Sequence, residues 1–127
     1  MIAHARGAAA YRQVEAQSRS PLELVVMLYD GALTRLTEAA AAAARGDLHA
    51  RGTAISKALA IISALQETLN VQAGGTVAEE LDRLYTYASH RLLDVTLKQD
   101  VSGIHEVHRL LSGLRDAWQQ IAQAEAS

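Results

Sequence analysis

The chain has 127 residues, half of them hydrophobic, and its 14 acidic and 12 basic residues give a formal charge of −2 at pH 7. This length suits one compact domain with a single core. The charges are mixed along the chain, so we expect neither a nucleic-acid partner nor membrane insertion. No cysteine, no membrane-spanning apolar run and no signal-peptide pattern at the N-terminus are present in the sequence, so we expect a cytoplasmic protein.

The composition favours an all-α fold, because the chain has one proline, no phenylalanine and many alanines and leucines. Residues 1–19 carry only a weak amphipathic pattern, and we expect them to form an N-terminal arm with a short helix at most. Residues 20–127 are expected to form four helices joined by short turns. Short connections make each helix run against its sequence neighbour, so the predicted architecture is an antiparallel up-down-up-down four-helix bundle.

The first predicted helix starts at Ser20 and runs to about residue 44. Ser20 can cap it, Pro21 suits the first helical position, and Glu23 completes a capping box. The expected core-facing stripe is Leu22, Val25, Tyr29, Ala32, Leu33, Leu36 and Ala40. The first two turns also carry apolar residues off this stripe, namely Leu24, Val26, Met27 and Leu28. We expect another segment or a partner to cover them, with deep burial as the alternative.

Turn and cap signals divide the rest of the chain into three further helices. Gly46 can take the left-handed position that ends the first helix, and Asp47 then caps the second. A glycine pair precedes a capping box of Thr76 and Glu79, and Asp100 caps the last helix. The core-facing residues expected in these helices are Leu48, Ile55, Ala58, Leu59, Ile61, Ile62, Leu65 and Leu69, then Val77, Leu81, Leu84, Tyr85, Ala88, Leu92 and Val95, and finally Ile104, Val107, Leu111, Leu114, Trp118 and Ile121.

The sequence offers no convincing catalytic or metal site. The Glu-x-x-His pairs of di-iron bundles are missing, and His105 and His108 have no third ligand that can be placed beside them. His49, with Arg51 and Gly52 after it, is a weak match to the phosphate-accepting histidine of a phosphotransfer domain, but it falls in the first turn of its helix. We therefore expect no enzyme, no metal, no cofactor and no small-molecule substrate, and keep a phosphotransfer domain as an alternative.

What remains is more apolar surface than one core can use. Tyr87, Leu93 and Leu97 lie off the stripe of the third helix, and Ile61 and Leu65 lie at one edge of the second. Such surface is typical of a protein that binds an amphipathic helical segment, although each residue alone fits ordinary surface or core edge. The candidate partner-binding residues are Leu24, Met27, Leu28, Ile61, Leu65, Tyr87, Leu93 and Leu97.

The N-terminal arm gives a related hypothesis. Tyr11 and Val14 can cover the apolar first turns of the first helix in the free protein, because residues 1–19 have no other evident packing partner. A partner that binds the same turns would then displace the arm.

Several segments together resemble the FliS family of flagellin export chaperones, over nearly the whole chain: AYRQV, SPLELVVMLYDGAL, KALAIISALQETLN, LYTYASHRL and LRDAW. Tyr11 matches the N-terminal motif of that family, and Ser20, Pro21 and residues 27–31 match its first-helix motif. The resemblance implies a cytoplasmic bundle that binds the disordered C-terminal segment of flagellin, prevents premature polymerisation and assists delivery to the flagellar type III export gate. A helical scaffold for another export cargo stays open beside it.

Overall fold

The computed structural model describes residues 20–69 and 71–126, with side chains for 20–69 and 74–125. These residues form α2 (Pro21–Ala44), α3 (Leu48–Glu67), α4 (Val71–Lys98) and α5 (Ser102–Ala126), and no strand occurs among them. The predicted all-α class is therefore confirmed. The predicted arm, with Tyr11 and Val14, lies outside the described residues and stays a prediction.

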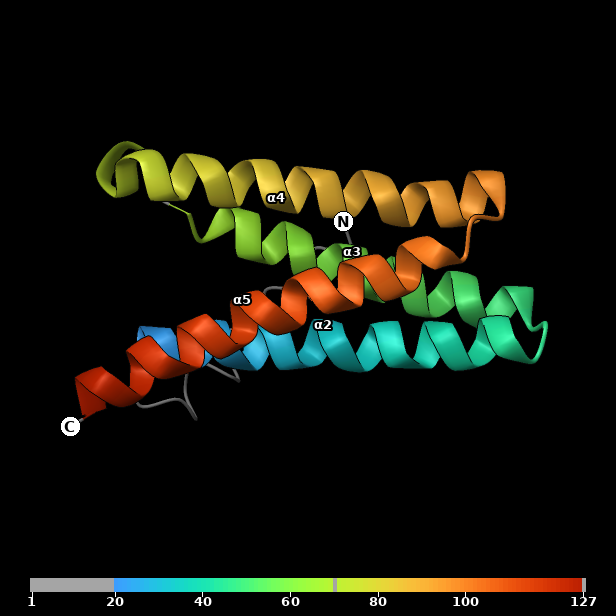
Figure 1. Ribbon diagram of the computed structural model, residues 1–127, viewed down its shortest axis with the longest axis horizontal. Coiled ribbons are helices and arrows are strands. Elements are labelled where there is room, and N and C mark those ends of the chain that lie inside the picture. Colours follow the sequence, from blue (N-terminus) through green and yellow to red (C-terminus); the bar gives the residue numbers. More distant parts are fainter. Residues whose placement is uncertain (1–19, 70, 127) are drawn as a thin grey trace, which may run out of the picture.

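The four helices lie side by side, and each runs back along the one before it (Figure 1). Helix α2 packs against α3 and α5, and α4 packs against the same two helices, so the helices form a ring around one core. Large side chains from all four helices fill this core: Tyr29, Leu36, Ile55, Ile62, Leu65, Tyr85, Leu92, Val95, Ile104, Val107 and Leu111.

The predicted helix boundaries correspond to hydrogen-bonded caps. Ser20 Oγ accepts a bond of 3.1 Å from the Glu23 N–H, and the Asp47 side chain accepts one of 3.0 Å from the Ala50 N–H. Gly46, between the end of α2 and Asp47, has a φ of +74°, the left-handed conformation expected at a helix C-terminus. Local signals thus fixed where α2 ends and α3 begins.

The ends of α4 differ in part from the prediction. The helix contains a break at Gly75, where φ is +58°, so its regular part starts beside the predicted cap Thr76. At the other end Asp100 accepts a bond of 2.5 Å from Ser102 Oγ, and its backbone carbonyl accepts the Gly103 N–H. Asp100 thus contacts the first residues of α5, which begins at Ser102.

The predicted core stripes need correction at several positions, chiefly at large side chains. Leu24 and Val26 are buried although they lie off the expected stripe of α2, so deep burial, the alternative reading, holds for both. Leu48, Val77 and Ile121 were expected in the core but are exposed. These three lie near helix ends, where a side chain can face inward by periodicity and still extend past the neighbouring helices.

Candidate partner-binding surface

In α4 the buried and exposed side chains alternate with the helical spacing that the sequence predicted. Tyr85, Ala88 and Leu92 are buried, whereas 44% of Leu93 and 77% of Leu97 is exposed. Leu93 and Leu97 are four positions apart, so they lie on neighbouring turns of one helix face. They form a pair of large apolar side chains in contact with solvent, which we call the α4 leucine pair.

Tyr87 lies on a different flank of α4. It is six residues from Leu93, which corresponds to about 120° around the helix. The Tyr87 hydroxyl donates a hydrogen bond to Glu106 of α5, and the Arg91 Nε donates to the same carboxylate at 2.6 Å. These bonds, chiefly that from Tyr87, hold the pKa of Glu106 below its usual value, and the bond to Glu106 raises the pKa of Tyr87. Tyr87 is thus half exposed but fixed at the junction of α4 and α5.

The three candidates on α2 have different surroundings. Met27 is 41% exposed, Leu28 is partly buried against the core, and Leu24 is only 5% exposed. A side chain that is already covered cannot offer free surface without a rearrangement. Of these three residues only Met27 presents the surface that the sequence predicted.

The two candidates on α3 belong largely to the bundle interior. Leu65 is fully buried in the core, as its place on the core-facing stripe predicted, and it offers no free surface. Ile61 is partly buried and packs towards α2, where its Cδ1 lies 3.4 Å from the position that a Cβ on Gly31 would take. The absence of a side chain at Gly31 lets Ile61 approach α2 closely.

The structure therefore does not gather the eight candidates into one patch. Exposed apolar atoms come from Met27 near the start of α2, from Tyr87 on one flank of α4 and from the leucine pair on another. Further large hydrophobic side chains that the sequence did not single out as surface are exposed at helix ends: Leu48, Val77, Val101 and Ile121. For Leu48, Val77 and Val101 the position beside a helix end or turn is the signal that would have indicated exposure.

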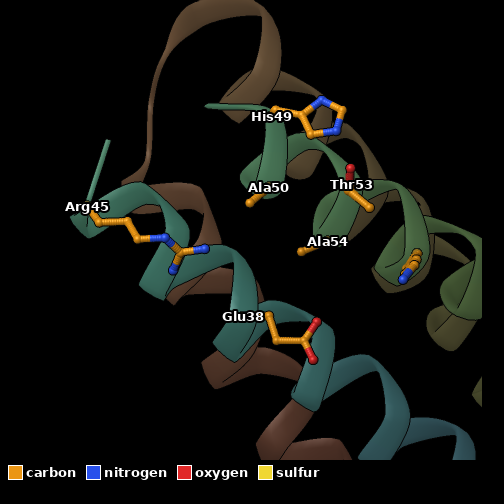
Figure 2. Close-up of a pocket in the computed structure, with 7 residues that line it drawn as sticks. Glu38, Arg45, His49, Ala50, Thr53 and Ala54 are labelled. Carbon is orange, nitrogen blue, oxygen red and sulfur yellow. The ribbon is translucent and has the colours of Figure 1, made fainter. Parts of the chain in front are cut away.

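A hollow of about 370 Å³ lies between the end of α2 and the start of α3 (Figure 2). Its wall carries Glu38, Arg45, His49, Thr53 and Lys57, together with two alanines. In Figure 2 the His49 ring lies at the rim on the first turn of α3. His49 is exposed on the first turn of α3.

Within the part of the chain that the structure describes, no group of three or more His, Cys, Asp or Glu side chains is placed to hold a metal ion. Within the same ranges no helix is both long enough and apolar enough to cross a membrane.

An all-helical bundle with exposed apolar side chains and no assembled catalytic group among its described residues is typical of proteins that bind other polypeptides. Comparison with known proteins gives the family. Residues 4–125 match the model of the family described as flagellar protein FliS, and the chain belongs to this family. It is a family of chaperones and not of enzymes.

Relatives from several bacteria match over most of their length. The flagellar secretion chaperone FliS of Salmonella typhimurium is 42% identical over 123 residues, which cover 93% of this chain and 91% of the relative. FliSB of Pseudomonas aeruginosa is 35% identical, with 88% and 92% covered, and FliS of Escherichia coli is 34% identical, with 91% and 89% covered. The similarity therefore extends across the whole bundle and is not confined to one motif.

Proposed function

We propose that this chain is a cytoplasmic chaperone that binds the disordered C-terminal segment of flagellin, prevents its premature polymerisation and assists its delivery to the flagellar type III export apparatus. The observation that carries the proposal is the α4 leucine pair on a bundle of the FliS family. Two large apolar side chains in contact with solvent on a well-packed helix are available to a partner without unfolding the core.

A disordered cargo suits such scattered surfaces. A segment that folds on binding can wrap around several helices, so Met27, Tyr87 and the leucine pair need not form one patch. Each apolar side chain that the cargo covers contributes roughly 1.5–3 kcal/mol if fully buried, from which the cost of ordering the segment is subtracted. Cargo held in this way cannot use the same residues for filament contacts, so polymerisation stops.

The direct test mixes the full chain with flagellin and with flagellin that lacks its C-terminal segment. Isothermal titration should show binding to the first and none to the second. In a seeded polymerisation assay the chaperone should delay filament growth in proportion to the amount of complex formed. Binding that does not depend on the C-terminal segment would contradict the proposal.

Delivery to the export gate is tested separately. A pull-down of the chaperone and flagellin complex from cytosolic extract should retain a component of the export apparatus, which peptide identification would name. The free chaperone and free flagellin serve as controls. Recovery of some other export substrate in place of flagellin would favour a scaffold for a different cargo.

A further inference from the structure

Arg51 of α3 is a charged residue with an unusual environment. It is 5% exposed, and its Nη1 donates a hydrogen bond of 3.1 Å to the side-chain carbonyl of Gln99. Its Nε is buried and has no acceptor among the residues that the structure describes. A guanidinium carries five N–H donors, and a buried charge is normally paired with a carboxylate. Here the partner is a neutral amide.

The two carboxylates nearest to this contact in sequence are held by other groups. Asp100, next to Gln99, lies 3.0 Å from Arg91 Nη1 and accepts a bond from Ser102. Hydrogen bonds from Ser102 and Arg91 keep the pKa of Asp100 below its usual value, so it stays ionised and engaged. Asp47 caps α3 through the Ala50 N–H and lies 3.8 Å from the Arg45 guanidinium. Neither is bonded to Arg51.

Gln99, the residue that covers Arg51, lies at the surface of the bundle. It is exposed and lies in the turn between α4 and α5, where its φ of +59° is uncommon for a residue with a side chain. Leu97, two residues before Gln99, and Val101, two residues after it, are both exposed. Figure 1 shows this turn at the same end of the bundle as the start of α3. The amide that covers the Arg51 guanidinium therefore belongs to a turn that carries exposed apolar residues two positions before and after it.

We propose that Arg51, Leu97 and Val101 form a docking surface for a helical segment of a partner protein that presents a carboxylate between apolar residues. The partner's carboxylate replaces the Gln99 amide on Arg51, because a charged acceptor binds a guanidinium more strongly than a neutral one and can engage two N–H groups at once. The apolar residues of the segment cover Leu97 and Val101. Charge complementarity sets the orientation of the segment, and the proposal does not depend on flagellin being the cargo.

The test uses the full chain and a pair of short capped helical peptides. One peptide carries a single glutamate with leucines on the adjacent turns, and the matched control carries glutamine in its place. Titration is followed by calorimetry and by the ¹H–¹⁵N signal of the Arg51 Nε–H. We expect the glutamate peptide to bind about tenfold more tightly than the control and to shift that signal.

Two variants separate a binding role from a purely structural one. Arg51→Met should abolish the preference for glutamate. Gln99→Gly removes the competing acceptor and suits the positive φ, so it should raise the affinity for the glutamate peptide several-fold. A contact that only holds the turn together would not give this gain. Equal binding of the two peptides, no binding of either, or no gain in Gln99→Gly would overturn the proposal, even if Arg51→Met fails to fold.

Discussion

The hydroxyl of Tyr29 in α2 lies 2.5 Å from the hydroxyl of Tyr85 in α4, and both residues are buried. The two rings are tilted by 48° with centroids 6.3 Å apart. Because α2 and α4 each pack on α3 and α5, this contact crosses the centre of the bundle. Each hydroxyl provides the other with a hydrogen-bond partner inside the bundle.

Removing one of these hydroxyls should destabilise the bundle. Tyr29→Phe leaves the buried Tyr85 hydroxyl without this partner, so we expect a loss of about 1–3 kcal/mol in the free energy of unfolding. The double variant Tyr29→Phe with Tyr85→Phe should lose less than the sum of the two single variants, because neither tyrosine hydroxyl then remains buried without the other. Urea unfolding followed by circular dichroism measures all three. Strict additivity would show that the two hydroxyls do not interact.

The Tyr29–Tyr85 pair also predicts how the free energy of unfolding changes at alkaline pH. Burial raises the pKa of both tyrosines above the ordinary value of 10.0. In the unfolded chain the hydroxyls ionise near that value, while in the folded protein they stay neutral. The stabilisation is therefore complete below about pH 10 and is lost as pH rises towards the raised folded-state values. Urea unfolding across this range should show a steep decline for the native chain and a shallower one for the doubly substituted protein.

Alanine substitution at Gly103 and at Gly113 of α5 should change the free energy of unfolding in opposite directions. A Cβ at Gly103 would lie 2.9 Å from Val95 Cγ2 and 3.1 Å from the Arg91 carbonyl oxygen, so α5 would have to move away from α4. We expect Gly103→Ala to cost roughly 1–3 kcal/mol. Gly113→Ala is the matched control, since nothing lies within 4 Å of its Cβ position and alanine favours a helix by about 0.5–1 kcal/mol over glycine. In thermal unfolding the midpoint temperature should fall for Gly103→Ala and rise for Gly113→Ala.

The sequence was sufficient to predict the helices because their ends depend on local chemistry. Ser20, Gly46 and Asp47 act on backbone groups within a few residues, and such signals can be read without the fold. Core membership was less predictable. Periodicity shows which way Leu48 or Val77 faces but not whether a neighbouring helix extends far enough to cover it.

Long-range contacts explain what the sequence could not show about the candidate site. Leu65 looked like an edge residue because the width of a helix face does not reveal how its neighbours are set around it. The sequence singled out Arg51 only as the basic residue after His49, and its hydrogen bond to Gln99, 48 residues further along the chain, is not visible in the local sequence. No local sequence pattern predicts that Arg51 and the turn at Gln99 come together in the fold.

A double serine substitution in the α4 leucine pair should distinguish flagellin binding from bundle stability. Replacing Leu93 and Leu97 by serine should weaken flagellin binding by about tenfold or more, because burial of apolar area on a partner is lost. Both residues are exposed in the free protein, so we expect less than about 1 kcal/mol of change in bundle stability. Titration calorimetry and urea unfolding measure the two quantities.

Ala88→Asp is the control for that variant. Ala88 is fully buried on the opposite side of α4, and a lone carboxylate there has no partner, so this substitution should unfold the bundle. If the double serine variant behaves in the same way, Leu93 and Leu97 support the fold and cargo binds elsewhere.

The last prediction concerns residues 1–19, which lie outside the described part of the chain. We expect this arm to cover the start of α2 through Tyr11 and Val14 and to be displaced by cargo. Deleting residues 1–17 should then raise cargo affinity, by no more than the free energy of the docked state, and should promote self-association. Amide hydrogen exchange tests the displacement directly: protection at residues 8–15 should be present in the free protein and lost when flagellin is added. If protection is absent throughout, the arm does not dock. If it is unchanged by flagellin, the arm belongs to a permanent surface and cargo does not compete with it.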